Sequence, residues 1–106
     1  MNEDQTETYR ALSQKRVALV TFLQVPLTAA NTPILQPAIG PATLELALVN
    51  STITELLHGA PISFPSRDEL DRIRKFSGAI SVEVETSNDF AALVTKALAL
   101  INTWPG

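Results

Sequence analysis

The stretch SRDELDRIRKFSGAISVEVET, residues 66–86, decides between two folds for this chain. It opens with a capping box: the Ser66 hydroxyl can accept from the third amide of a helix, while the Glu69 carboxylate reaches back to the Ser66 amide. A helix is therefore predicted to begin here. From Ala79 to Glu85, however, apolar and polar residues alternate with the period of a half-buried strand, and Gly78 offers an end to the helix.

The competing interpretation continues this helix to about Thr86. Ile73, Ile80 and Val84 also share one helical face, and the internal glycine costs only about 1 kcal/mol. A strand needs a partner, so we favour the helix. The expected fold is mainly α, with about four helices in a small bundle and room for one short strand at 79–85. The alternative is a small α/β fold with strands near 17–25, 61–64 and 79–85.

Three further helices follow from apolar spacing and end signals. Apolar residues recur at helical spacing from Thr6 to about Gln24, although the second half of this segment also fits a buried strand. A second helix is predicted at 41–58, since Pro41 suits a first helical position and a glycine follows His58. A last helix is predicted at 88–104, capped by Ser87 or Asn88.

A charge-free run extends from Val17 to Leu44 and contains VPLTAANTPILQPAIGPA, residues 25–42. Its prolines interrupt any membrane-spanning helix, and their spacing of four residues does not make the one-sided ridge of a P-x-x-P ligand. We predict an irregular but ordered connection over 25–40. Its apolar side chains Ile34, Leu35 and Ile39 are expected to insert into the domain or a neighbouring subunit.

Length and composition exclude several classes of protein. The 106 residues fit one domain, 1–106, with residues 1–5 expected to be disordered. A net charge of −3 does not favour nucleic acid as a partner, and the absence of cysteine removes thiolate chemistry and Cys metal sites. We predict no metal and no cofactor. The acidic, polar amino end lacks the pattern of a secretory signal, so a cytoplasmic location is expected.

The residues that could carry catalysis have simpler explanations. His58 stands at a predicted helix end, where its charge would interact well with the helix dipole. Glu83 and Glu85 would share a face of the short strand, but a solvated polar face opposite the apolar residues explains them better. No phosphate-binding glycine loop and no nucleophile elbow occurs. We therefore lean away from an enzyme and predict no catalytic residue.

The helices at 41–58 and 88–104 carry very few charged residues, which favours association through their apolar faces. The expected function is a non-catalytic protein-interaction or scaffolding module that forms a homo-oligomer or binds another protein. The candidate interface comprises Ile34, Leu35, Ile39, Leu46, Val49, Ile53, Leu57, Leu98, Leu100 and Trp104. The alternative is a small-molecule-binding protein or small enzyme with an apolar pocket between helices, lined by His58, Tyr9 and Trp104.

Overall fold

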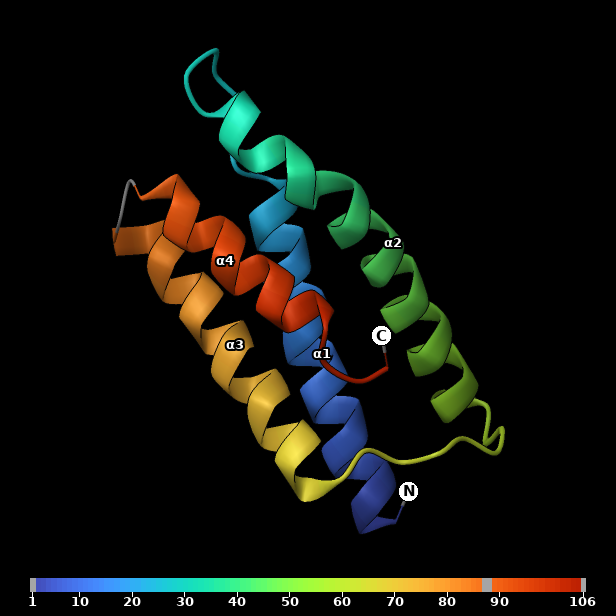
Figure 1. The fold of residues 1–106 in the computed structure, drawn as a ribbon. Helices are drawn as coiled ribbons and strands as arrows, with labels where there is room; N and C mark the ends of the chain where they lie inside the picture. The colour runs from blue at the N-terminus through green and yellow to red at the C-terminus, as the bar shows by residue number, and fades with distance from the viewer. Residues whose placement is uncertain (1, 87–88, 106) are drawn as a thin grey trace.

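The computed structural model describes residues 2–86 and 89–105 and consists of four helices (Figure 1). They are α1 (Glu3–Leu23), α2 (Thr32–Leu57), α3 (Arg67–Thr86) and α4 (Phe90–Ile101). No strand occurs in these described ranges. The prediction of a mainly α, four-helix bundle is confirmed.

The helices form an elongated bundle of 46 × 20 × 17 Å in which α1 and α4 lie on one diagonal. Both α1 and α4 pack against α2 and against α3, whereas α2 and α3 do not contact each other. Along the bundle, α1 and α3 run one way and α2 and α4 the other (Figure 1). The connection from α2 to α3 therefore crosses the end of the bundle where the N-terminus lies.

The short strand for which the prediction left room at 79–85 is not formed, because α3 continues unbroken to Thr86, as the favoured interpretation predicts. Ile73 and Ile80 are fully buried on one helical face, whereas Val82 is exposed, so burial follows the helical period. No described segment offers the partner strand that an isolated strand would need. The α/β alternative falls with it, since residues 17–23 belong to α1 and residues 61–64 have no regular structure.

The capping box at the start of α3 is confirmed. The Ser66 amide donates to Glu69 Oε1 at 3.0 Å, and the Glu69 amide donates to Ser66 Oγ at 3.2 Å. The Glu69 pKa is lowered because its carboxylate accepts this backbone hydrogen bond.

The predicted irregular connection over 25–40 is wrong for residues 32–40, which form the first turns of α2. Pro33 lies in the first turn, where its missing amide hydrogen costs nothing, but Pro37 and Pro41 lie inside the helix. Their rings are exposed, while Leu35 and Ala38 on the opposite side are buried in the core. Core burial thus outweighs the local cost of two internal prolines.

The shorter connection that remains, residues 24–31, is held by side-chain hydrogen bonds. Asn31 is buried: its side-chain nitrogen Nδ2 donates to the Pro26 carbonyl, and its side-chain oxygen accepts from the Thr28 backbone amide. The segment before α2 is therefore held by hydrogen bonds and is about half as long as predicted.

The N-terminal residues and the last helix also differ from their predictions. The disorder predicted for residues 1–5 is wrong for residues 2–5, because the Asn2 side chain caps α1 and residues 3–5 form its first turn. The caps predicted for the last helix, Ser87 and Asn88, lie outside the described residues. Within them, the Asp89 side chain accepts from the Ala92 amide, and α4 ends at Ile101 rather than near Trp104.

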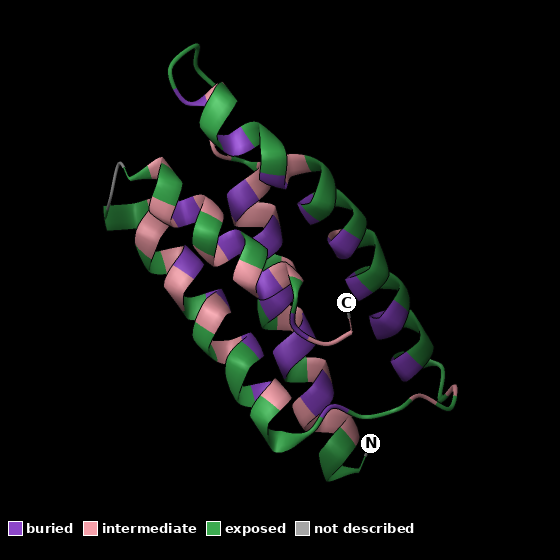
Figure 2. Cartoon of the chain, viewed as in Figure 1, coloured by how far each residue is buried: buried purple, intermediate pink, exposed green. Residues whose placement is uncertain are grey.

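The core lies along the inner side of all four helices (Figure 2). Its largest apolar members are Leu12, Leu19, Phe22, Leu35, Ile53, Ile80, Leu93 and Leu100. The outward side of α2 is exposed along most of its length in the same view. The outward side of α2 therefore exposes apolar side chains to solvent.

Candidate functional site

A buried ion pair stands at the centre of the bundle. The Lys15 ammonium is fully buried and lies 2.6 Å from Glu45 Oε2, joining α1 to α2. It also donates to the backbone carbonyls of Thr103 and Trp104, each at 3.2 Å. The three ammonium donors therefore hold the segment after α4 against the first two helices.

Burial is the largest influence on the Lys15 pKa and lowers it, while the hydrogen bond and charge of Glu45 oppose the shift. A lysine with a lowered pKa is a common nucleophile or base in enzymes. Here the nitrogen has no solvent access and all its donors are engaged. The cluster is structural, because no substrate can reach it.

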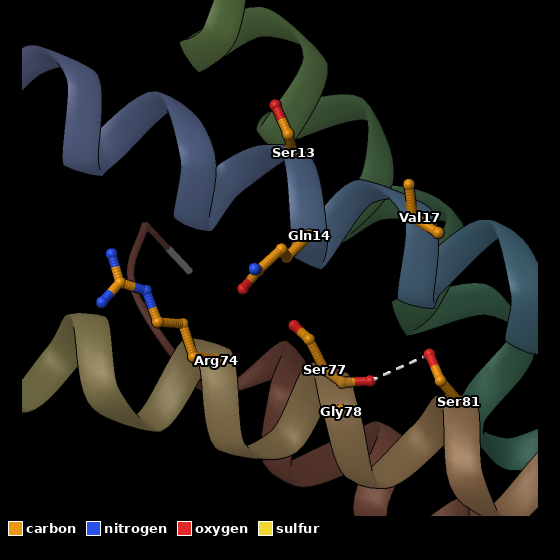
Figure 3. Close-up of a pocket in the computed structure, with 7 residues that line it drawn as sticks. All are labelled: Ser13, Gln14, Val17, Arg74, Ser77, Gly78 and Ser81. Carbon is orange, nitrogen blue, oxygen red and sulfur yellow. Dashed lines mark hydrogen bonds between the residues drawn. The ribbon is translucent and has the colours of Figure 1, made fainter.

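A groove of about 460 Å³ lies between α1 and α3 on the surface of the bundle (Figure 3). Its lining comprises Ser13, Gln14 and Val17 from α1 and Arg74, Ser77, Gly78 and Ser81 from α3. Small residues predominate, which leaves space between the helices. Gln14 and Ser77 point toward each other across the groove, and the Arg74 side chain lies at one end (Figure 3).

The polar groups of this groove are incompletely satisfied. Ser77 is only 4% exposed, and its hydroxyl has no hydrogen-bond partner among the described residues. The neighbouring Ser81 hydroxyl donates to the backbone carbonyl of Ser77 at 3.3 Å, not to the Ser77 hydroxyl. Arg74 forms no ion pair within the described part of the chain.

One side of α2 carries a second surface feature, a stripe of five exposed residues that we call the α2 seam: Ile34, Pro37, Pro41, Leu44 and Leu48. Leu44 is 75% exposed, and Ile34 and Leu48 are each 41% exposed. No charged side chain interrupts the seam. The only acidic residues of α2 are Glu45, which is buried, and Glu55, which lies beyond the seam.

The structure separates the ten residues of the predicted interface into three groups. Leu35, Val49, Ile53 and Leu100 are buried in the core of the single chain. Ile39, Leu46 and Trp104 are half-buried against that core. Ile34, Leu57 and Leu98 are exposed. The last group offers the most side-chain surface to another molecule without a change in the fold.

The predicted interface does not include Leu44 and Leu48, which flank the apolar stripe of the helix predicted at 41–58. Once α2 is extended to Thr32, they continue a stripe that begins at Ile34. The groove was also missed, since nothing in the sequence indicates that Gln14 and Ser77 face each other.

The candidate catalytic residues do not come together. His58 is exposed at the end of α2. Glu83 accepts from Lys96 of α4, whereas Glu85 is exposed and lies about 200° away around the same helix. Within residues 2–86 and 89–105, no group of three potential metal ligands occurs.

The sequence predicts, as an alternative, an apolar pocket lined by Tyr9, His58 and Trp104. Tyr9 and Trp104 pack against the core, and none of the three residues lines the groove between α1 and α3. None of the four described helices is long and apolar enough to cross a bilayer.

Comparisons with protein families, curated proteins and solved structures find no match to this chain. Function must therefore be argued from the two surfaces, the groove and the α2 seam.

Proposed function

We propose that the chain is a non-catalytic interaction module that forms a homodimer through the α2 seam. The observation that carries the proposal is Leu44, which is 75% exposed within an uncharged apolar stripe. Exposed apolar stripes of this kind commonly mark surfaces that bind another protein.

The spacing of the seam supports a helix as the partner. The intervals between its five residues alternate between three and four, which is the repeat of a helix-to-helix seam. Two helices with this pattern pack side by side at a crossing angle of about 20°.

The absence of charge supports a second copy of this chain. A charged seam would select a partner of opposite sign, whereas an uncharged one complements itself across a two-fold axis. In an antiparallel pair centred on Pro41, Ile34 would meet Leu48 of the second copy, and Pro37 would meet its Leu44. The seam is therefore self-complementary in both length and side-chain order.

The size of the seam sets the expected affinity. Residues 34–48 span about 21 Å of helix, which covers less area than the roughly 800 Å² that each partner buries in a standard interface. The internal prolines also leave the carbonyls of residues 33 and 37 without helical donors, which favours some retained water. We expect a dimer with a dissociation constant on the order of micromolar.

Sedimentation velocity from about 1 to about 200 µM tests the proposal, since that range brackets a micromolar constant. The wild-type protein should change from monomer to dimer, and Leu44→Glu should remain monomeric with an unchanged circular dichroism spectrum. Val82→Glu is the matched control, because Val82 is 59% exposed on α3, away from the seam. A wild-type monomer throughout, or equal dissociation by Val82→Glu, would contradict the proposal.

Leu98 is the one predicted interface residue of α4 that lies on the surface, at 37% exposure. Leu98→Glu therefore asks whether the interface extends from α2 onto α4. The cytoplasmic location expected from the sequence stays a prediction.

A further inference from the structure

We propose that the groove between α1 and α3 binds a small organic carboxylate, with Arg74 holding the carboxylate group and the Ser77 hydroxyl donating to it. This site is separate from the α2 seam, and the proposal does not depend on dimer formation.

The Ser77 hydroxyl gives the first reason. A buried polar group almost always has a hydrogen-bond partner, because leaving it unpaired destabilises the fold. Ser77 is 96% buried and its hydroxyl is unpaired, yet it points toward Gln14 of α1 across the groove (Figure 3). Unsatisfied groups of this kind are expected where a ligand completes the hydrogen bonding.

Charge gives the second reason and the class of ligand. Arg74 is the only charged residue that lines the groove, in a chain whose net charge is −3. Its guanidinium has no acidic partner in the described part of the chain, and its planar fork matches the two oxygens of a carboxylate. A single positive charge balances a carboxylate monoanion better than the greater charge of a phosphate monoester.

The remaining lining indicates an apolar body. Val17 is 60% exposed beside the groove, and a Cβ added to Gly78 would meet no heavy atom within 4 Å outside its chain neighbours and its own helix backbone. A volume of about 460 Å³ falls within the range of small-molecule sites. One aromatic ring or a short alkyl chain could therefore lie over Val17 and Gly78 while its carboxylate reaches Arg74.

Benzoate is a suitable probe, with benzamide as its neutral analogue and phenyl phosphate as its more highly charged one. In a two-dimensional nitrogen–proton NMR titration, benzoate should shift the amide signals of Gln14, Ser77 and Gly78 and saturate at millimolar concentration, as expected for so small a ligand. Benzamide should bind at least about tenfold more weakly, because it lacks the charge that pairs with arginine.

Two substitutions and one matched control assign the roles. Arg74→Gln should weaken benzoate binding about tenfold, whereas Arg72→Gln, which removes an exposed arginine of the same helix, should change it less than about twofold. Ser77→Ala should weaken binding several-fold while leaving the midpoint of urea unfolding unchanged or higher, because it removes an unpaired buried hydroxyl. A serine with only a structural role would not show both weaker benzoate binding and an unchanged or higher unfolding midpoint when replaced by alanine.

Several outcomes would overturn the proposal. They are the absence of saturable shifts up to about 50 mM benzoate, equal binding of benzamide, and equal losses from Arg72→Gln and Arg74→Gln. Tighter binding of phenyl phosphate would overturn the carboxylate class. Shifts at the groove that depend on protein concentration alone would assign it to a second copy instead.

The titration spectra themselves report whether each variant is folded. Arg74→Lys, which keeps the charge without the planar fork of the guanidinium, should bind benzoate with intermediate affinity.

Discussion

Replacing Lys15 with methionine should strongly destabilise the protein. Glu45 would keep a carboxylate whose side chain is only 7% exposed, and the carbonyls of Thr103 and Trp104 would each lose a donor. Removing one partner of a buried ion pair costs about 3–5 kcal/mol. A chain of 106 residues has a total stability of roughly 5–16 kcal/mol, so this one change should remove a large share of it.

The double variant Lys15→Met/Glu45→Met should recover most of that loss. Two methionines of similar length replace the pair, and well-packed apolar replacements of buried ion pairs are often neutral or stabilising, by up to about 4 kcal/mol. The two substitutions should therefore be far from additive, with a coupling energy on the order of 3 kcal/mol.

Urea unfolding followed by circular dichroism and by the fluorescence of Trp104 measures both effects. The matched control is Glu7→Gln, which breaks an exposed pair whose closest atoms, Glu7 Oε1 and Arg67 Nη1, are 4.0 Å apart. It should change the unfolding free energy by less than about 1 kcal/mol. A loss below about 1 kcal/mol for Lys15→Met, or a double variant as unstable as the sum of the singles, would refute the reasoning.

The pH dependence gives an independent check on the same lysine. Burial lowers its folded-state pKa below the ordinary value of 10.5. Between the folded and unfolded values, the unfolded chain binds more protons, so the contribution of Lys15 to the unfolding free energy rises with pH and falls as pH drops through the folded pKa. The double variant should lack this rise with pH.

Three further substitutions test local features of the fold. Ser66→Ala should cost about 1 kcal/mol in urea unfolding, because it removes half of the capping box of α3, and a loss of zero would contradict that role. Gly78→Ala should stabilise by up to about 1 kcal/mol, since outside its chain neighbours and its own helix backbone the added Cβ meets no atom within 4 Å, and glycine is a poor helix former. Gly59→Ala should instead destabilise by about 1 kcal/mol, because Gly59 has a φ of +73°, and a higher melting temperature for this variant would argue against the observed turn.

Local end signals were the most reliable part of the sequence. The capping box at Ser66 and the glycine after His58 located the start of α3 and the end of α2 without knowledge of the tertiary fold. These signals work because they concern hydrogen bonds and backbone angles within a few residues of each other.

The start of α2 was predicted wrongly because tertiary burial overrode local preference. Pro37 and Pro41 each remove a helical hydrogen bond, which argued for an irregular segment. The evidence for a helix was the helical spacing of three apolar residues among the prolines. These residues, Leu35, Ala38 and Ala42, are all buried. Spacing of the apolar residues was thus a better guide here than the prolines.

The buried ion pair had a signal in the sequence that was not used. Lys15 stands between Leu12 and Leu19 on the apolar stripe of α1, and Glu45 stands between Ala42 and Val49 on that of α2. One basic and one acidic residue on two apolar stripes indicate a buried pair, because neither charge would be stable alone in a core. The pairing of Gln14 with Ser77 had no such signal, since both are polar residues of ordinary appearance.

The packing of the helices makes the two proposals separable. The α2 seam lies on a helix that does not contact α3, whereas Arg74 and Ser77 belong to α3. Leu44→Glu should therefore abolish dimer formation and keep the response to benzoate, while Arg74→Gln should do the reverse. If each variant instead affected both measurements, binding and self-association would be thermodynamically coupled, and the coupling would have to be equal in both directions. Within the bundle, α1 and α4 are the two helices that contact both α2 and α3, so such coupling is expected to pass through one of them or through the connection at 58–66.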